Sequence, residues 1–459
     1  MENRNAMEYG GSVVDLNYIR FLIPCSSHVL EMGCGSGDLL AALAPKSAIG
    51  IDRDHAAIEL AKKKYPELTF LRADIENFAE FSHLLDWKGI DYVLLDRSLS
   101  FLVDIQSFLI ELGKRVSAQC RIVFVNRSHY LEHFSSWFTQ SSAQSSIGAT
   151  ALRVEDVENF CFLTGLDVVK HEWRVLLPNP GSKIGQLFNR VISTLPLVRK
   201  AGIRHYVVAR SRVTKDSETV IPSVSIVIPA KNERGNIAKA ISRLPSMGCE
   251  CEVIFVEGDS TDGTWEEILR VKEHYKNIPI VALKQMGSGK GAAVRTGFNQ
   301  ASGDILIILD ADLTVPPEDL PKFVDILRSG RGEYVNGSRL VYKVEEGAMQ
   351  FLNQIANHMF AILFRFLLNQ QLTDTLCGTK AIRRVDYLRV AENREYFGEF
   401  DPFGDFDLIF GAAKLNLKFV EIPIRYKSRS YGSTQIARFR HGWLLLRMVV
   451  FAYRKLKAI

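Results

Sequence analysis

The sequence predicts an α/β protein of two domains, residues 1–210 and 223–459, each built around its own sheet. The 459 residues exceed what one hydrophobic core usually supports. From about His28, and again from about Ser223, the chain repeats a strand, a Gly-rich or polar turn, a helix and a strand that ends in an acid. Between these halves, residues 211–222 are polar and end in proline, which is the composition of an interdomain linker.

The predicted strands are apolar runs bounded by turn residues. In the first half they fall at 28–32, 48–51, 91–95, 121–125, 167–177 and 205–209. In the second half they fall at 224–229, 252–257, 278–283, 305–309 and 418–422. Residues 56–64 and 236–244 have the helical period between strands.

Composition excludes several classes of protein. Hydrophobic residues make up 47% and charged residues 24%, which is typical of a globular chain and argues against disorder. The seven cysteines are odd in number and contain no C-x-x-C pair, so reduced thiols in a cytoplasmic protein are expected. The polar N-terminal stretch has no apolar signal core, so secretion is not expected.

In the first half, Gly33, Gly35 and Gly37 stand directly after a predicted strand and before a helix. Glycine there lets the backbone turn tightly and approach a ligand closely. Fifteen residues after Gly37, Asp52 ends the next strand, where a carboxylate can accept both ribose hydroxyls. The pattern indicates a site for a nucleoside.

With Glu31 included, this turn closely resembles motif I of class I S-adenosylmethionine-dependent methyltransferases, E/D-x-G-x-G-x-G. The resemblance covers roughly residues 10–210 and implies a Rossmann-like sheet that binds S-adenosyl-L-methionine. It assigns the ribose to Asp52, places Asp74 beside the adenine and puts Asp96 at the end of the fourth strand. The implied cofactor residues are therefore Glu31, Gly33, Gly35, Gly37, Asp52, Asp74 and Asp96.

The sequence leaves methyl transfer itself open. The fourth-strand segment reads LDRS rather than [DN]PP[FY], which disfavours methylation of nucleic-acid amino groups, and no nucleic-acid partner is expected. His129 and His133 follow the fifth predicted strand and are candidates for a general base, although each also reads as an ordinary packing or surface histidine. A domain that binds the nucleoside without turnover is the alternative.

The second half carries three motifs in order: VSIVIPAKNE at 224–233, VIFVEGDSTDGT at 253–264 and GDILIILDADLTVPPEDL at 303–320. In the third, Asp310 and Asp312 end an apolar strand one residue apart. Two carboxylates so placed can share one hard divalent cation, Mg or Mn, and that cation can bridge a diphosphate leaving group. These motifs predict a metal site at Asp310 and Asp312.

The triplet resembles the GT-A nucleotide-diphospho-sugar fold of glycosyltransferase family 2, especially its polyprenyl-phosphate sugar synthases of the dolichyl-phosphate mannosyltransferase type. The resemblance covers essentially 223–457 and implies a nucleotide-diphospho-sugar donor. It implies these substrate-binding residues: Pro229, Ala230, Asn232, Glu233, Glu257, Lys290, Arg295, Asp310, Ala311, Arg339 and Arg429. The sequence departs from the family at Gly258 and Asp259, which alters the nucleobase contact, and at Gln435, where the family's lid has lysine.

The resemblance also implies an inverting transfer with Asp312 as a catalytic residue. A lipid phosphate is already anionic and needs no general base. A hydroxyl acceptor would need one, and Asp405 and Asp407 in FGDFD are the candidates.

No run of 18 or more apolar residues predicts a membrane span. Segment 349–368 and the helix around 443–453 come partway, and the final 49 residues carry eleven Lys and Arg against one acid, Glu421. These features fit either a buried helix with a solvated tail or a helix on an anionic membrane surface. The second interpretation predicts a peripheral protein on the cytoplasmic face of the membrane with a lipid-linked acceptor.

Three functions remain open at this point. The first is a bifunctional methyl- and glycosyltransferase. The second is a glycosyltransferase acting on a soluble glycan hydroxyl, with a non-catalytic nucleoside-binding domain. The third is a dinucleotide oxidoreductase fused to a sugar module, although the glycine spacing here is not G-x-G-x-x-G.

Overall fold

The computed structural model of the chain divides into two compact units, Met1–Arg212 with Arg454–Ile459, and Val213–Tyr453. It describes residues 13–127, 150, 152–177, 183–212, 221–342, 351–396, 406–429, 431 and 438–459. Most of the predicted linker at 211–222 lies outside the described residues, as do His129, His133 and Asp405.

The first unit is a seven-stranded sheet in the order β3-β2-β1-β4-β5-β7-β6. Its strands are β1 (His28–Met32), β2 (Ser47–Asp52), β3 (Thr69–Arg72), β4 (Tyr92–Asp96), β5 (Arg121–Arg127), β6 (Leu166–Arg174) and β7 (Arg204–Ser211). All neighbours pair in parallel except β7, which runs antiparallel to both β5 and β6. The strand order reverses at β1 and β4, where parallel α/β sheets place their ligands.

Helices cover this sheet and close its core. They are α2 (Val13–Leu22), α3 (Asp38–Leu43), α4 (His55–Lys64), α5 (Phe78–Phe81), α6 (Ile105–Arg115), α8 (Val154–Leu163) and α9 (Lys183–Val191). One buried cluster joins apolar side chains of β1, β4, β5 and β7 to α6 and α8. All of its residues lie between Leu30 and Ala209.

The second unit is also a seven-stranded sheet, in the order β10-β9-β8-β11-β13-β12-β14. Its strands are β8 (Val224–Ala230), β9 (Cys251–Glu257), β10 (Ile280–Lys284), β11 (Ile305–Ile308), β12 (Tyr334–Ser338), β13 (Lys380–Arg383) and β14 (Phe419–Pro423). Strands β10, β9, β8 and β11 are parallel, β13 is antiparallel to β11 and β12, and β14 is parallel to β12.

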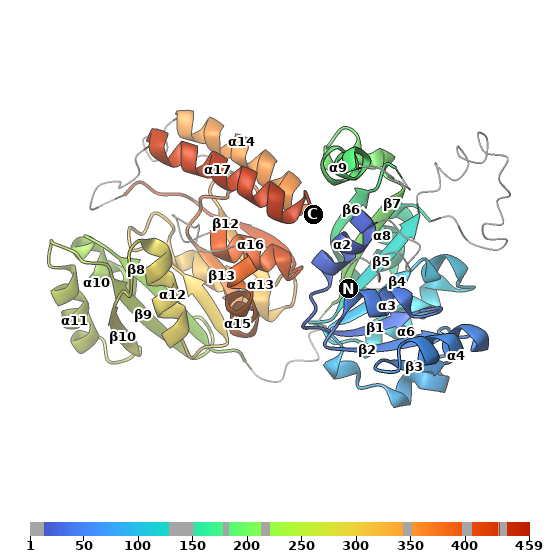
Figure 1. Cartoon of the computed structure of the whole chain (residues 1–459). Helices are drawn as coiled ribbons and strands as arrows, with labels where there is room; N and C mark the ends of the chain where they lie inside the picture. The colour runs from blue at the N-terminus through green and yellow to red at the C-terminus, as the bar shows by residue number, and fades with distance from the viewer. Residues whose placement is uncertain are drawn as a thin grey trace. The chain divides into compact units, whose positions relative to one another are not determined.

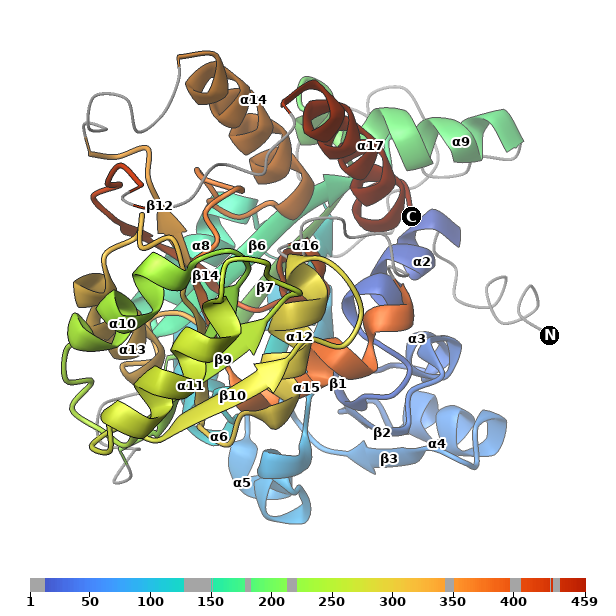
Figure 2. The ribbon, with the colours of Figure 1, turned by 90° about the vertical axis from the view of Figure 1, so that its left-hand side faces the viewer.

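Eight helices are described in this part of the chain. They are α10 (Arg234–Ser242), α11 (Thr264–His274), α12 (Lys290–Gln300), α13 (Leu320–Arg328), α14 (Phe351–Leu368), α15 (Arg384–Glu392), α16 (Phe406–Lys414) and α17 (Arg438–Leu456). Helices α14 and α17 lie side by side in both ribbon views (Figures 1 and 2). The rings of Phe366 in α14 and Tyr453 in α17 are stacked, with their centroids 6.4 Å apart. Within the described residues, neither these helices nor any other is long and apolar enough to cross a membrane.

The prediction of two α/β units is confirmed, and every predicted strand has a counterpart within a few residues. Strands β3, β12 and β13 were not predicted as separate strands. They have only four or five residues each, and β13 reads KAIR, with charged residues at both ends. Strand β3 reads TFLR and β12 reads YVNGS, so polar, charged or glycine residues interrupt all three runs and none stands out as an apolar strand.

The basic C-terminal tail includes a lysine that is buried rather than exposed to solvent. Lys457 is buried and its ammonium forms an ion pair with buried Glu172 of β6, within the first unit. The backbone carbonyl of Ala458 accepts a hydrogen bond from Nε of Arg190 at 2.7 Å. The last residues of the chain are therefore part of the first unit's packing.

Candidate functional sites

The Gly-rich turn of the first unit uses its glycines for two purposes. Gly33, Gly35 and Gly37 all have positive φ, the left-handed region that favours glycine. A Cβ at Gly33 would lie 2.7 Å from Ser98 Cβ, and one at Gly37 would lie 2.6 Å from the Phe70 ring, so both positions need glycine for packing. A Cβ at Gly35 would meet nothing within 4 Å. The backbone at Gly35 therefore borders open space, where a ligand could approach it.

Asp52 lies beside this open position. Its Oδ2 accepts a hydrogen bond from the backbone N–H of Gly35 at 2.8 Å, and its Oδ1 accepts one from Asp54 at 2.9 Å. The structure thus brings the predicted turn and the predicted ribose acid together. Asp74 is held locally, with its Oδ1 accepting the N–H of Glu76 at 3.0 Å.

Glu31 and Asp96 add acidic groups from the adjacent strands β1 and β4. Glu31 is buried, and its Oε2 has no hydrogen-bond partner among the described residues. Burial, followed by the charges of Asp96 and Asp52, raises the pKa of Glu31 well above its usual range. Asp96 accepts a hydrogen bond from Arg204 Nη1 at 2.9 Å, and Arg204 also pairs with Asp15 at 3.0 Å. The unpartnered Glu31 oxygen and the open Gly35 backbone fit a polar nucleoside ligand such as S-adenosyl-L-methionine.

In the second unit, Asp310 follows β11 and faces Lys290 at the start of α12. Lys290 Nζ lies 2.7 Å from Asp310 Oδ1. Burial raises the pKa of Asp310, but the charges of Lys290, Lys380 and Arg339 outweigh it and hold the pKa below its usual value. Asp310 is therefore an ionised carboxylate at neutral pH, as a metal ligand must be.

The backbone of Gly378 presses directly against this pair. A Cβ at Gly378 would lie 2.0 Å from Asp310 Oδ2 and 2.3 Å from Lys290 Nζ. No side chain fits in that space without displacing Asp310 or Lys290. Gly378, in the segment DTLCGTKAI, was not among the predicted site residues.

Asp312 is contacted by an arginine that lies 117 positions later in the chain. Arg429 Nη2 donates to Asp312 Oδ2 at 2.7 Å, and Arg429 Nη1 donates to Glu233 Oε1 at 3.4 Å. Thr314 donates to Asp312 Oδ1 through its N–H at 3.1 Å and its hydroxyl at 2.9 Å. Burial raises the pKa of Glu233, while Asn236 and Arg429 partly offset this effect. Three predicted residues, Glu233, Asp312 and Arg429, thus meet in space.

The predicted nucleotide edge is a network of turns at the ends of β8 and β9. Asn232 has a positive φ, and its Oδ1 accepts the N–H of Thr261 at 2.8 Å. The backbone N–H of Asn232 donates to Ser260 Oγ at 3.0 Å. Ala230 ends β8, and its carbonyl accepts the N–H of Gly258 at 3.0 Å. These bonds fix two neighbouring turns at the carboxyl edge of the sheet.

Several other predicted residues lie around this edge. Glu257, at the end of β9, is buried, and Lys284 Nζ is 3.9 Å from its carboxylate. Pro229 is half-buried in β8, and Ala311 is buried between Asp310 and Asp312. The Tyr431 ring covers Gly235 at the start of α10, where a Cβ would meet the ring at 2.5 Å.

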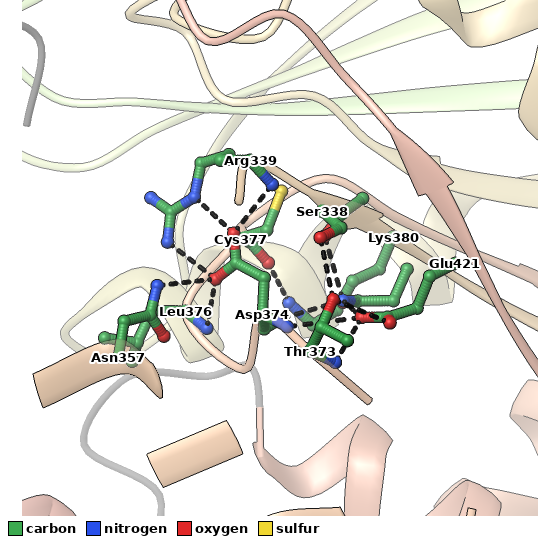
Figure 3. Close-up of polar contacts among 11 residues, drawn as sticks. Ser338, Arg339, Asn357, Thr373, Asp374, Leu376, Cys377, Lys380 and Glu421 are labelled. Atoms are coloured by element: carbon green, nitrogen blue, oxygen red, sulfur yellow. Dashed lines mark hydrogen bonds and ion pairs between the residues drawn. The ribbon is translucent and has the colours of Figure 1, made fainter. Parts of the chain in front are cut away.

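Arg339, a predicted substrate-binding residue, belongs to a buried polar network at one end of β12, β13 and β14 (Figure 3). Arg339 donates to the two carboxylate oxygens of buried Asp374, from Nε at 2.6 Å and from Nη2 at 2.8 Å. Asn357 Nδ2 contacts the same carboxylate at 3.1 Å. Arg339 was predicted to bind substrate, and the contacts described for its guanidinium are this ion pair and the Tyr426 ring, 5.1 Å away.

Glu421 of β14 holds the other side of this network and was missed as a candidate. Its carboxylate accepts the N–H and the hydroxyl of Thr373, each at 2.8 Å, and the N–H of Asp374 at 3.2 Å. Ser338 Oγ lies 2.8 Å from the Thr373 hydroxyl. An acid inside the apolar strand FVEIP was the available signal, because a carboxylate that is half-buried in a strand needs polar partners.

Asp407 lies at the start of α16 and is engaged by arginines. Its Oδ2 accepts from Arg394 Nε at 2.8 Å, and Arg295 Nη1 lies 4.0 Å away. The structure therefore associates Arg295 with Asp407, whereas the sequence placed Arg295 near the diphosphate. The other candidate base, Asp405, lies outside the described residues.

The predicted metal site consists of two carboxylates, those of Asp310 and Asp312. Across the part of the chain that the structure describes, no group of three or more His, Cys, Asp or Glu side chains is arranged to hold a metal ion. Two carboxylates are nevertheless sufficient for Mg²⁺ when substrate phosphates and water complete its oxygen shell. Asp310 and Asp312 fit a cation that is bound together with a diphosphate.

Comparison with known proteins gives the following similarities. Residues 225–390 match the family model described as glycosyl transferase family 2, and residues 26–166 match one described as a methyltransferase domain. The chain is 30% identical over 218 residues to a dolichol-phosphate mannosyltransferase of Pyrococcus furiosus, covering 46% of this chain and 59% of that protein. It is 30% identical over 225 residues to the glycosyltransferase AglJ of Haloferax volcanii, covering 49% and 69%.

A third relative is the undecaprenyl-phosphate 4-deoxy-4-formamido-L-arabinose transferase of Yersinia enterocolitica. It is 30% identical over 169 residues, which cover 36% of this chain and 50% of that protein. The chain thus spans between half and about two thirds of the length of these curated relatives.

Proposed function

Because the chain belongs to glycosyl transferase family 2 and carries a methyltransferase domain ahead of it, we propose that it is a bifunctional transferase. Its second unit transfers a sugar from a nucleotide-diphospho-sugar to a polyprenyl phosphate. Its first unit binds S-adenosyl-L-methionine and methylates a separate acceptor. The predicted domains are 1–210 and 223–459, joined by the polar segment 211–222; the compact units of the structure are close to these, but Arg454–Ile459 belongs to the first unit.

The donor assignment rests on the charges around Asp310 and Asp312. The two carboxylates lie within 2.7 Å of Lys290 and Arg429 respectively, so acids and bases alternate in one site. The acids are suited to a divalent cation and the bases to diphosphate oxygens. A bound Mg or Mn ion would supply charge stabilisation to the leaving diphosphate. Glu233 and Asn232 border the same site and are suited to the nucleotide.

The acceptor assignment rests on chemistry and on the relatives. The names of two relatives, the dolichol-phosphate mannosyltransferase and the undecaprenyl-phosphate transferase, each include a polyprenyl phosphate. In the inverting transfer, an acceptor phosphate oxygen bonds to the anomeric carbon as the bond from that carbon to the diphosphate oxygen breaks, and the electron pair leaves with the diphosphate. A phosphate needs no base, and the Asp407 carboxylate is already engaged by Arg394. This supports an anionic acceptor over a hydroxyl.

A peripheral location on the cytoplasmic face of the membrane follows from the lipid acceptor. Helix α17 exposes Trp443, Leu446 and Val450, with fractional exposures of 63%, 42% and 49%, at the spacing of one helix face. The neighbouring helix α14 exposes Met359 and Ile362. Scattered exposed apolar residues are ordinary, but an apolar face with flanking arginines is suited to a bilayer surface. Phe451 and Tyr453, further along the same helix, are half-buried.

The test is transfer of radiolabelled sugar into organic-extractable polyprenyl phosphate, over a panel of nucleotide sugars, with Mg²⁺, with Mn²⁺ and with a chelator. We expect product with at least one donor, and its loss in the chelator. Full activity in the chelator would contradict the proposed metal dependence. Product formed only with a soluble glycan would contradict the proposed lipid acceptor. Calorimetric titration with S-adenosyl-L-methionine, followed by assays for methyl turnover, separates the bifunctional enzyme from one with a non-catalytic first unit.

A further inference from the structure

Helix α9 of the first unit is attached with its polar side inward. Among its nine residues, the buried one is Asn189. Asn189 Oδ1 accepts the N–H groups of Leu176 and Leu177, both at 2.9 Å, and its Nδ2 donates to the Leu177 carbonyl at 2.7 Å. Ser193 adds a hydrogen bond to the Asn189 carbonyl. Polar contacts therefore hold this helix beside the end of β6, where a globular protein normally uses apolar ones.

The apolar residues of α9 point into solvent as a consequence. Ile184, Leu187 and Phe188 are 81%, 59% and 40% exposed. The turn that follows exposes Leu195 at 39% and Leu197 at 98%. Five large apolar side chains thus lie uncovered within fourteen residues, although water disfavours each of them. A face of this kind requires an apolar partner.

The charge of the same stretch identifies the partner. Residues 183–201, here called the α9 segment, contain Lys183, Arg190, Arg199 and Lys200 and no acid. Lys183, Arg190 and Lys200 are exposed around the apolar face. A helix with an exposed apolar face and a basic border has the composition of one that lies in the interface of an anionic bilayer.

We propose that the α9 segment inserts into the surface of an anionic lipid bilayer, with Ile184, Leu187 and Leu197 entering the apolar region. This gives the first unit a membrane contact of its own, in addition to the one proposed for α14 and α17. The inference does not depend on which acceptor receives the sugar or the methyl group. A protein partner would also cover an apolar face, but the basic border and the absence of acids favour lipid phosphates.

The full-length chain is tested as Ile184→Glu/Leu187→Glu/Leu197→Glu against a matched control, Leu60→Glu/Leu84→Glu/Phe162→Glu. The control residues are in the same unit and are 53%, 57% and 69% exposed, but they lie outside the α9 segment. Binding is measured by flotation with vesicles of phosphatidylcholine and phosphatidylglycerol, and with phosphatidylcholine alone. We expect the α9 variant to bind anionic vesicles about tenfold more weakly than wild type, and the control to bind as wild type does.

A second measurement, quenching of tryptophan fluorescence, uses a variant that keeps an apolar side chain at position 197. Leu197→Trp should be quenched by brominated phosphatidylglycerol more strongly than Leu84→Trp, after subtraction of the wild-type tryptophans. Thermal denaturation and binding of S-adenosyl-L-methionine check that each variant is folded. Equal vesicle binding by both triple variants, or equal quenching at positions 197 and 84, would overturn the proposal. So would a change in association state of the α9 variant without a change in vesicle binding, since a protein would then cover this face.

Discussion

At the scale of single residues, the pKa of Asp310 is set by two opposing effects, burial and neighbouring positive charges. Burial raises the pKa of a carboxylate, and this is the largest single influence on Asp310. Lys290, Lys380 and Arg339 together exceed it, so the group stays ionised. The outcome depends on Lys290 remaining at 2.7 Å from Asp310, and the lack of a side chain at Gly378 leaves room for this pair.

Replacing Gly378 with Ala should therefore lower the rate of sugar transfer by about a hundredfold while leaving the fold intact. The added Cβ would lie 2.0 Å from Asp310 Oδ2 and 2.3 Å from Lys290 Nζ, so at least one of these side chains must move. A displacement of about 1 Å in a catalytic constellation lowers rates by about a hundredfold. The assay is sugar transfer under saturating metal, and thermal unfolding of the second unit, which contains Gly378, serves as the check on folding. A variant with wild-type turnover would show that this contact does not position the acids.

The sequence predicted the acids of this site and the basic residues around them, but not which acid each basic residue contacts. Asp310 and Asp312 are recognisable because they end an apolar strand one residue apart. The pairing of Arg429 with Asp312, or of Arg339 with Asp374, joins residues 117 and 35 positions apart through the fold. Sequence periodicity carries no information on such long-range pairs. It therefore could not show that Arg339 forms an ion pair with the buried Asp374.

At the scale of elements, β7 concentrates titratable groups at one end of the first sheet. Its first residues, Arg204 and His205, are both buried, and Arg204 bridges Asp15 and Asp96. Burial, followed by the charge of Arg204, lowers the pKa of His205 to about 4, while Asp156 partly opposes this. In contrast, burial raises the pKa of Asp15 to about 6. The two groups therefore respond oppositely to acid.

His205→Gln tests this balance. The unfolded histidine binds a proton near pH 6.5 and the folded one near pH 4, so wild type loses stability as pH falls through this window. The loss amounts to about 3 kcal/mol, and the variant lacks it. Asp15 contributes the opposite slope to both proteins and cancels in the comparison. Unfolding of the first unit is followed by denaturant titration at pH 7 and pH 4. A stability difference between wild type and variant that is the same at both pH values would contradict the assignment.

Elements with strong patterns were predictable and weakly patterned ones were not. The long apolar strands β8 and β9 were expected within a residue or two of their observed bounds. The four-residue strand β13 depends on its neighbours β11 and β12 for its existence. In α9 the helical spacing marks an apolar face, but spacing does not tell whether that face is buried. Here Asn189 takes the buried side because its amide satisfies three backbone groups.

At the scale of the whole molecule, the residues that the structure describes include two separate hydrophobic cores. One comprises residues between Leu30 and Ala209, and the other comprises residues between Val224 and Ile424. Each core is built by its own seven-stranded sheet. This organisation followed from length and from two successive strand–turn–helix patterns. The inclusion of Arg454–Ile459 in the first unit could not be predicted in this way. It depends on the ion pair between Lys457 and Glu172, which lies 285 positions earlier in the chain.

Two cores with separate ligand sites should respond to their ligands independently, and this is the prediction that tests the molecule as a whole. Asp52→Ala should lose S-adenosyl-L-methionine binding and keep sugar transfer, because Asp52 holds the Gly35 turn and offers the ribose carboxylate. Asp310→Asn/Asp312→Asn should show the reverse. The controls are Asp54→Ala, which removes a helix cap beside Asp52, and Asp325→Asn, an exposed acid of the second unit.

Calorimetric unfolding provides the measurement. Ligand at a hundred times its dissociation constant stabilises the unit that binds it by about 2.7 kcal/mol, so each ligand should raise one unfolding transition and leave the other in place. S-adenosyl-L-methionine should shift the first unit's transition in wild type and Asp54→Ala but not in Asp52→Ala. Nucleotide with Mg²⁺ should shift the second unit's transition in wild type and Asp325→Asn but not in the Asp310→Asn/Asp312→Asn variant. If either ligand moved both transitions equally, the sites would be energetically coupled and the chain would act as one cooperative transferase.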